Sequence, residues 1–263
     1  MASDLSAARR EEIAALVAEV GHARVQDLAR DFGVSEVSIR TDLAVLDRTG
    51  RLRRVHGGAV AVPGPEREDP VESTMVRDAR AKRAIGARAA ALIPSGASVA
   101  LDVGSTCQAV AHALVARRDL TELVVLTNGL SIALALEPAM PRFTVVLTGG
   151  TLRPLQHSLV APLAANTVSG LHVDIAVIGC NGIAPDGAVT NLNLPEAEVK
   201  RAFLAACDRA VLVAETAKFG QRHLGGIGRL ADFADVVTAG TPSPRFQTAV
   251  AHAGAAYHYA GIG

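Results

Sequence analysis

The sequence has few of the residues that base-stacking platforms, disulfide frameworks and membrane spans require. Of its 263 residues none is Trp and only 3% are aromatic, so large stacking surfaces for bases or sugars are not expected. Its three cysteines form no Cys-x-x-Cys pair, which excludes a disulfide framework and a cysteine-rich zinc site and suits a reducing compartment. No apolar run approaches the roughly 18 residues of a membrane-spanning helix. Together these absences predict a cytoplasmic protein.

The charges of the chain cancel, and its histidines form no cluster. Because 26 basic residues balance 26 acidic ones, a surface for nucleic acid has to come from local clustering. The histidines lack the spacing of metal ligands, so we expect no metal site. We expect no organic cofactor either, since the first strand-to-helix turn of the second half lacks the Gly-x-Gly-x-x-Gly pattern of dinucleotide binding.

A break in composition divides the chain. Residues 63–74 read PGPEREDPVEST, with three prolines, five charged residues and no apolar period, which is typical of a linker. Helical patterns precede this stretch, and β-branched runs alternating with Ala-rich segments follow it. We predict two domains, residues 1–62 and 76–263, joined by a linker over residues 63–75.

Three helical patterns and a ribbon fill the first domain. Apolar residues recur at intervals of three and four over residues 7–20, 25–32 and 35–48, which is the period of a helix with one buried face. Ser35 stands where the third helix needs an N-cap, after a short turn of the helix-turn-helix kind. Alternating apolar residues around Gly57-Gly58 then predict a small two-stranded wing.

The third helix presents a short, positive outer face. With Ile39, Leu43 and Leu46 facing the core, its arginines and small polar residues face outward, as reading of a major groove requires. Between residues 40 and 54 five arginines stand against two aspartates, so positive charge gathers where phosphates would lie. The alternative is a protein-interaction module with a solvated Arg-rich edge. The residues that we predict to contact DNA are Ser35, Ser38, Arg40, Thr41, Arg48, Arg53, Arg54 and His56.

The second domain alternates apolar runs with Ala-rich helical segments, the pattern of a mostly parallel sheet with helices on both faces. Five runs have strand character, at residues 99–101, 123–126, 143–147, 175–178 and 211–213. Small residues, hydroxyls and amides follow these runs. We expect them to gather at the carboxyl edge of the sheet, where open α/β sheets bind ligands.

The turn Gly104-Ser105-Thr106 opens a predicted helix over residues 106–117. Its free N–H groups and two hydroxyls suit a phosphate at the positive end of the helix dipole. Lys218, one of three lysines in the chain, follows the fifth strand and is placed to add a cation to the same anion. Taken singly, the turn also fits a plain helix cap, and the lysine also fits a solvated side chain.

Residues 25–60, VQDLARDFGVSEVSIRTDLAVLDRTGRLRRVHGGAV, closely resemble the N-terminal winged helix-turn-helix of the DeoR family of bacterial transcriptional regulators. The family usually carries Thr-Ile-Arg-Arg-Asp-Leu on the recognition helix, and here Ser38 and Thr41 replace the first Thr and the second Arg. The family's C-terminal sensor domain is similar in fold to ribose-5-phosphate isomerase and commonly senses phosphorylated sugars. The segments that look like this sensor domain are ALDVGSTCQAVAHAL, VLTNGLSIA, LTGGTLRP, DIAVIGCNGI and LVAETAKFG.

The resemblance implies a set of residues at the ligand edge of the sensor. They are Asp102, Gly104, Ser105, Thr106, Asn128, Gly149, Gly150 and Lys218. Glu196 and Lys200 are weaker candidates, and we interpret their spacing of four residues as a structural ion pair along one helix.

The isomerase likeness raises an alternative function, that of a sugar-phosphate isomerase. Proton abstraction beside a carbonyl needs a positioned base. Asn181 stands where isomerases carry acidic residues, and residues 185–194 lack their glycine-flanked lysine. We therefore predict a regulator and not an enzyme. It is expected to be a homo-oligomeric repressor of carbohydrate-catabolism genes that binds double-stranded operator DNA under control of a phosphorylated sugar or related metabolite.

Overall fold

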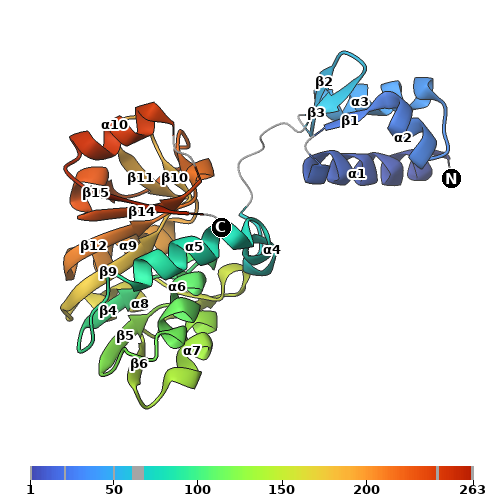
Figure 1. Ribbon diagram of the computed structural model, residues 1–263. Helices are drawn as coiled ribbons and strands as arrows, with labels where there is room; N and C mark the ends of the chain where they lie inside the picture. Colours follow the sequence, from blue (N-terminus) through green and yellow to red (C-terminus); the bar gives the residue numbers. More distant parts are fainter. Residues whose placement is uncertain (1, 21, 50, 61–67, 241–242, 262–263) are drawn as a thin grey trace. The chain divides into compact units, whose positions relative to one another are not determined.

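The chain folds into two units, which the computed structural model describes over residues 2–20, 22–49, 51–60, 68–240 and 243–261. Unit 1 spans Met1–Arg67 and unit 2 spans Glu68–Gly263 (Figure 1). Helices and a small ribbon make up unit 1, whereas strands and helices alternate through unit 2. This arrangement confirms the predicted α/β class with an N-terminal winged helix-turn-helix.

Part of the stretch predicted to be a linker belongs to unit 2. Residues 63–67 lie outside the described residues, but Glu68 and its neighbours lead into helix α4 (Val71–Val76). Val71 is buried, so the helix has an apolar anchor. Because a helix of six residues is too short to show an apolar period, no pattern in the sequence indicated it.

In its described residues, unit 1 combines three helices with a three-stranded antiparallel sheet. These elements are α1 (Ala2–Val20), β1 (His22–Arg24), α2 (Val25–Asp31), α3 (Glu36–Arg48), β2 (Arg53–Val55) and β3 (Gly58–Val60). β3 lies between β1 and β2. β1 is an additional strand, too short for an alternation to predict. Gly58 permits its close approach, since a Cβ there would lie 2.3 Å from the Ala23 carbonyl oxygen.

The apolar faces predicted for the helices form the core of unit 1. Ile13 and Val17 of α1 pack with Ile39 and Leu43 of α3, and all four side chains are buried. Val20, which the apolar period of the first helix predicts to be buried, is 51% exposed because α1 ends at that residue. The outer face of α3 is therefore oriented as the sequence predicts.

A seven-stranded parallel sheet runs through unit 2 in the order β15-β14-β12-β9-β4-β5-β6. Its strands are β4 (Ser98–Leu101), β5 (Leu123–Thr127), β6 (Phe143–Leu147), β9 (Val173–Gly179), β12 (Cys207–Val213), β14 (Asp235–Ala239) and β15 (Ala256–Ala260). The first five match the predicted strands. β14 and β15 are additional strands that the sequence analysis did not predict. β14 begins with an aspartate, and β15 contains two tyrosines and a histidine, so neither is a continuous apolar run.

Helices cover both faces of the sheet. One face carries α5 (Ala79–Ala90), α6 (Ser105–Ala116) and α7 (Leu130–Leu136), and the other carries α8 (Leu163–Ser169), α9 (Leu194–Ala205) and α10 (Pro244–His252). Successive strand residues divide between the two cores, since Val99 faces the first group of helices and Ala100 the second. Judged by length and hydropathy, no helix of the described ranges qualifies as a membrane span.

Smaller elements connect the strands. They are β7 (Thr151–Arg153), β8 (Ser158–Val160), β10 (Gly182–Ile183), β11 (Ala188–Asn191), β13 (Gly225–Arg229), η1 (Glu137–Ala139), η2 (Pro154–Gln156), η3 (Thr216–Lys218) and η4 (Leu230–Asp232). β7 pairs with β8, and β11 lies between β10 and β13. Gly129 bridges to Ser158, which holds β8 against the carboxyl end of β5.

Candidate functional site

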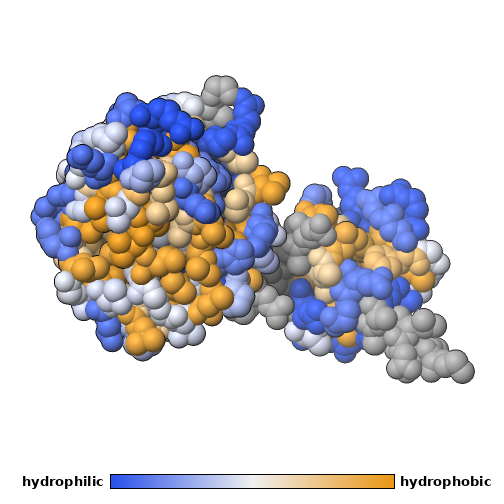
Figure 2. All heavy atoms as spheres, turned by 90° about the horizontal axis from the view of Figure 1, so that it is seen from below, coloured by the Kyte–Doolittle hydropathy of each residue, from blue (hydrophilic) through white to orange (hydrophobic). Residues whose placement is uncertain are grey.

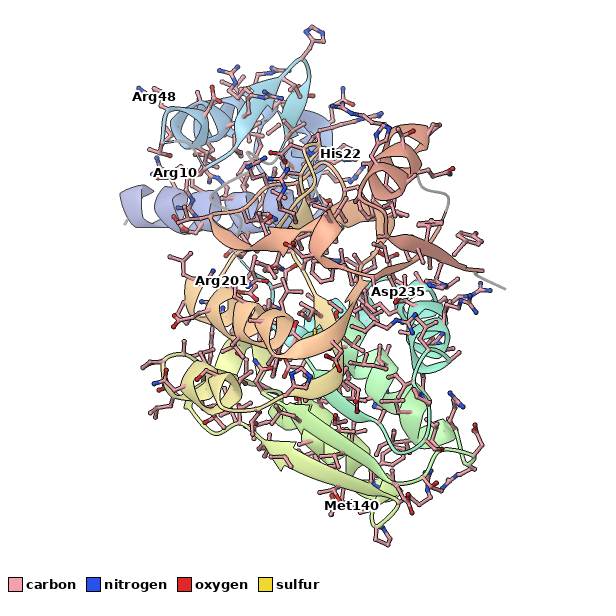
Figure 3. All side chains as sticks on the ribbon, turned by 90° about the vertical axis from the view of Figure 1, so that its left-hand side faces the viewer. Arg10, His22, Arg48, Met140, Arg201 and Asp235 are labelled. Carbon is pink, nitrogen blue, oxygen red and sulfur yellow. The ribbon has the colours of Figure 1, made fainter. Side chains whose placement is uncertain are left out.

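The outer face of α3 is oriented by its N-cap. Ser35 Oγ accepts a hydrogen bond from the Ser38 N–H at 3.2 Å, as the sequence predicts. Arg40, Thr41 and Arg48 are exposed, and Figure 3 shows Arg48 at the surface of unit 1. The helix therefore offers two guanidinium groups and short hydroxyl side chains to a partner, as a major groove requires.

Arg40 forms an ion pair within α3 but stays accessible to a partner. Its guanidinium is 55% exposed and donates to Glu36 Oε2 at 2.5 Å, one helical turn back. An exposed pair of this spacing stabilises a helix by only about 0.3–0.5 kcal/mol. A phosphate or a guanine edge therefore competes for Arg40 at little cost.

The wing adds cations beside the recognition helix. Arg53, Arg54 and His56 are all exposed. The Arg54 N–H donates to Asp47 Oδ1 at 3.1 Å, which ties the wing to the last turn of α3. Arg51 has a different role, because it forms two hydrogen bonds with Glu11 at 3.0 and 2.8 Å within unit 1.

In unit 2, the turn after β4 leads into α6. Gly104 caps the helix at a φ of 115°, a conformation that favours glycine. Ser105 and Thr106 are half-buried in the first turn, and among the described residues neither hydroxyl has a hydrogen-bond partner. The first amides of α6 and these hydroxyls can donate hydrogen bonds to an anion at the positive end of the helix.

Asp102 directly follows β4, two residues before Gly104. The side chain is fully buried, and its Oδ2 accepts hydrogen bonds from Lys200 Nζ and from the Gly179 N–H, the latter at 3.0 Å. Asp102 Oδ1 has no partner among the described residues. Burial lowers the pKa of Lys200, but the carboxylates of Asp102 and Glu196 outweigh burial and raise it to about 12. Lys200 is therefore charged at neutral pH, and its ammonium group joins the ends of β4 and β9 by donating to Asp102 and to the Gly179 carbonyl.

The expected ion pair between Glu196 and Lys200 is wrong. Lys200 pairs with Asp102, and Glu196 Oε1 instead accepts hydrogen bonds from Arg153 at 2.9 Å and from Ser158 Oγ at 2.5 Å. The two side chains leave α9 toward different strand ends, where buried partners compensate their charges better than a pair along the helix would.

Asn128 joins three segments of the edge from inside. It is fully buried, its Oδ1 accepts from the Val103 N–H at 3.2 Å, and its Nδ2 donates to the Leu159 carbonyl at 3.3 Å. Gly149 and Gly150 follow β6 with φ values of 68° and 126°. Asn128 shapes the edge through its side-chain amide and the two glycines through their backbone conformation. Direct contact of these three residues with a ligand stays a prediction.

Lys218 ends η3 and is half-buried. Burial raises the pKa of the Cys180 thiol to about 12, and the ammonium groups of Lys200 and Lys218 oppose that rise. Both lysines therefore lie within electrostatic range of the carboxyl end of β9. The sheet thus draws these predicted residues toward one edge, although they come from distant parts of the sequence.

Two residues of this edge were missed by the sequence analysis. Arg153 forms an ion pair with Glu68 at 2.6 Å and a second one with Glu196 at 2.9 Å. Arg153 is the one charged residue of the segment LTGGTLRP, so its position three residues after the double glycine was a usable signal. Glu68 lies in a stretch with the composition of a linker, and nothing in that stretch distinguishes it from its charged neighbours.

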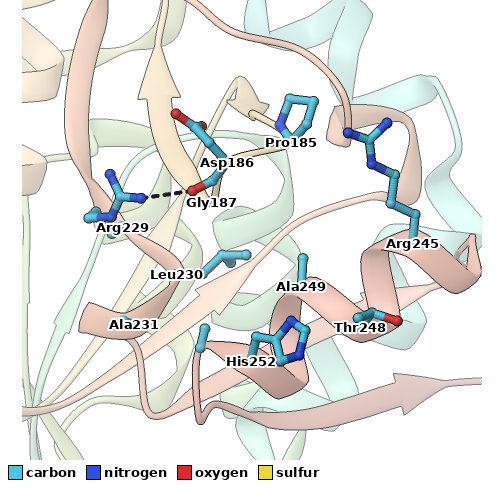
Figure 4. Close-up of a pocket in the computed structure, with 11 residues that line it drawn as sticks. Pro185, Asp186, Gly187, Arg229, Leu230, Ala231, Arg245, Thr248, Ala249 and His252 are labelled. Carbon is cyan, nitrogen blue, oxygen red and sulfur yellow. Dashed lines mark hydrogen bonds between the residues drawn. The ribbon is translucent and has the colours of Figure 1, made fainter.

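A surface cavity of about 420 Å³ lies elsewhere on unit 2 (Figure 4). It is lined by the turn over residues 185–187, by residues 229–231 and by α10. Arg229 is engaged there, since it donates to the Asp186 carbonyl at 2.8 Å. None of the residues predicted to bind a ligand lines this cavity.

A winged helix-turn-helix followed by a parallel α/β unit is the domain arrangement of a DNA-binding regulator with a ligand sensor. Residues 9–63 match the model of the DeoR-like helix-turn-helix domain, and residues 77–239 match that of the DeoR C terminal sensor domain. The chain belongs to the DeoR family of transcriptional regulators.

Curated relatives agree with this family. The glycerol-3-phosphate regulon repressor of Haemophilus influenzae is 31% identical over 89% of both chains. The HTH-type transcriptional regulator GlpR of Haloferax volcanii is 34% identical over 90% of this chain and 91% of its own. These relatives are regulators, so the isomerase alternative is not favoured and the chain is not an enzyme.

Among solved structures, ribose 5 phosphate isomerase A from Neisseria gonorrhoeae is similar to part of the chain. It is 15% identical, with a TM-score of 0.39, over 54% of this chain and 53% of its own.

Proposed function

We propose that the chain is a repressor whose binding to operator DNA is controlled by a phosphorylated sugar or related metabolite. The observation that carries this proposal is that one chain contains both an exposed cationic helix face, in unit 1, and a strand-end edge, in unit 2. At that edge lie a helix N-terminus and two hydroxyls that have no partner among the described residues. The protein acts in the cytoplasm, on the nucleoid.

DNA contact comes from α3 and the wing. Ser38, Arg40, Thr41 and Arg48 face the major groove, and Arg53, Arg54 and His56 hold phosphates or enter the minor groove. Ser35 supports them by capping α3. The relatives named as regulon repressors support repression as the direction of control.

The ligand binds at the edge formed by Gly104, Ser105, Thr106 and Lys218. A phosphate group fits it because amide and hydroxyl donors are fixed at a positive helix end and a compact cation lies close by. Asp102, Asn128, Gly149 and Gly150 set the shape of the edge from beneath. The name of the Haemophilus relative supports a phosphorylated three-carbon polyol or a similar compound as the class of ligand.

Copies of unit 2 associate to pair the recognition helices. β6 is an edge strand, and Thr144 and Val146 on one of its faces are exposed beside Val124 of β5. Figure 2 shows hydrophobic residues spread over the end of unit 2 where β6 lies, and Met140 is exposed there as well. Burying such a face between two copies favours a dimer, because removing apolar surface from water contributes about 25 cal/mol per Å² against the entropic cost of association. A two-fold dimer presents two recognition helices to paired half-sites.

A thermal-shift screen of the full-length protein tests the ligand assignment. Phosphorylated polyols and sugars are compared with their unphosphorylated forms, and only a phosphorylated compound is expected to raise the melting temperature, by mass action on the folded state. An unphosphorylated compound that stabilises the protein equally well would refute the anion site.

A further inference from the structure

The first residues of unit 2 are bound to the edge at which we propose that the ligand binds. Glu68, the first residue of unit 2, forms an ion pair with Arg153 at 2.6 Å, and its side chain is only 11% exposed. The backbone carbonyl of Asp69 accepts a hydrogen bond from Gln156 Nε2 at 2.7 Å. Two neighbouring residues are thus bound to β7 and η2, directly after the Gly149-Gly150 turn.

Arg153 divides its guanidinium between two carboxylates. One nitrogen donates to Glu68 and the other to Glu196 Oε1, at 2.6 and 2.9 Å. Glu196 also accepts from Ser158 Oγ, and its charge acts on Lys200. Lys200 in turn donates to Asp102, so hydrogen bonds at Arg153 and at Lys200, together with the charge of Glu196 acting on Lys200, connect Glu68 to Asp102, two residues before Gly104.

Negative charge is in excess within this set. Three carboxylates, those of Glu68, Glu196 and Asp102, face two cations, Arg153 and Lys200. Burial and the charge of Glu196 raise the pKa of Glu68, so its ionised form is disfavoured there despite Arg153. Glu196 and Asp102 are fixed by α9 and by the end of β4, whereas Glu68 stands outside any helix or strand. Glu68 is therefore the carboxylate of the three that can leave most easily.

We propose that Glu68 holds Arg153 in place of an anionic group of the ligand, an inference that rests on the proposed function. When a phosphate enters the edge, Arg153 donates to its oxygens and Glu68 is displaced. A phosphate oxygen accepts charge-assisted hydrogen bonds from a guanidinium at least as well as a carboxylate does. It also gains the first amides of α6 and the Lys218 ammonium, which Glu68 does not use. Displacement frees the start of unit 2, to which the linker and unit 1 are covalently joined.

The test uses the full-length protein and inorganic phosphate as the probe. Glu68→Gln keeps the shape of the side chain but weakens its hold on Arg153, and Glu72→Gln, an exposed glutamate four residues on, is the matched control. Calorimetry is expected to give at least five-fold tighter phosphate binding for E68Q, no change for E72Q and weaker binding for Arg153→Gln. Hydrogen exchange of the amides in residues 68–76 is expected to rise in the wild type when phosphate is added, and to be raised in E68Q without it.

The proposal would be overturned if E68Q bound phosphate no more tightly than the wild type, or did not bind it at all. Arg153→Lys provides a second variant in case R153Q does not fold, because it keeps the charge and loses the forked geometry, and its phosphate affinity is expected to fall as well. Neither readout uses DNA. If the phosphate results are as predicted but the protein binds no operator, the proposed function alone is refuted. If the protein binds its operator but the phosphate results fail, the exchange at Arg153 alone is refuted.

Discussion

Lys200 of α9 donates to Asp102 Oδ2 at the end of β4, although 98 residues separate them in the sequence. Both side chains are buried, and the pair lies between β4, β9 and α9. Removing one partner leaves an uncompensated charge in the interior, so each residue depends on the other. The contact fixes the carboxyl edge of the sheet beside Gly104, where we propose that the ligand binds.

The cost of breaking this pair is testable. Lys200→Met is expected to lower the free energy of unfolding by about 3–5 kcal/mol, as measured by urea denaturation at pH 7. Asp102→Asn combined with Lys200→Met is expected to recover much of that loss, because the lone carboxylate is gone. Glu198→Gln on the exposed side of α9 serves as the control and changes stability by no more than about 0.5 kcal/mol. A single variant as stable as the control would contradict the ion pair.

Arg40 is expected to govern binding to DNA. Arg40→Ala is expected to weaken operator binding by about 1–3 kcal/mol, since it removes a contact to a base edge or phosphate and only a weak pair with Glu36. Fluorescence anisotropy with labelled operator DNA measures the loss, and the melting temperature is expected to stay unchanged. Arg88→Ala, an exposed arginine of unit 2, is the control. Equal operator affinity in R40A and wild type would exclude α3 as the reading helix.

The ligand response is expected to depend on the turn before α6. The double variant Ser105→Ala with Lys218→Ala removes a hydroxyl donor and the ammonium group proposed to bind the anion, so an effector found by thermal shift is expected to lose at least ten-fold in affinity. Operator binding in the absence of effector is expected to persist. Ser169→Ala, an exposed serine at the end of α8, is the control. If the double variant keeps the full thermal shift, the ligand binds elsewhere on unit 2.

Asp235 gives stability a defined dependence on pH. Burial opposes its ionisation, but hydrogen bonds from Arg209 and His258 outweigh burial and hold the pKa of Asp235 below its ordinary value. Since the folded pKa lies below the unfolded one, the stabilisation is present above about pH 4 and is lost as the pH falls through the lowered pKa.

Urea titrations of the wild type and Asp235→Asn at pH 7 and pH 3 measure this effect. The wild type is expected to be the more stable at pH 7, and the difference in unfolding free energy is expected to shrink at pH 3. A difference that stays constant or widens in acid would show that the Asp235 carboxylate is not stabilised in the folded state.

The exposed apolar face is expected to determine the oligomeric state. Val146→Lys places a charge on the edge strand β6, so burial of that face between two copies becomes unfavourable. Light scattering after gel filtration is expected to show a smaller assembly than for the wild type. Leu224→Lys, at another exposed apolar residue of unit 2, is expected to leave the mass unchanged. A V146K variant with the mass of the wild type would place the interface elsewhere.

The parts of the fold that the sequence predicted are those set by local physics. Ser35 caps α3 because a hydroxyl at that position meets the free amide three residues on, and the period of three and four residues orients Ile39 inward. The contacts that it did not predict join distant positions. Lys200 of α9 reaches Asp102 after β4 and not Glu196, and Glu68 reaches Arg153 of β7, 85 residues away, because the tertiary fold brings these distant segments together. Spacing along one helix contains no information about that choice.

The central claim, that a ligand in unit 2 controls DNA binding by unit 1, is tested most directly by one titration. Full-length protein is titrated onto labelled DNA from upstream of its own gene, with and without the phosphorylated compound that most raises its melting temperature. The account predicts tight binding that weakens steeply with salt, and at least a ten-fold change in affinity when the compound is present. Operator affinity that is identical with and without a saturating ligand would contradict it.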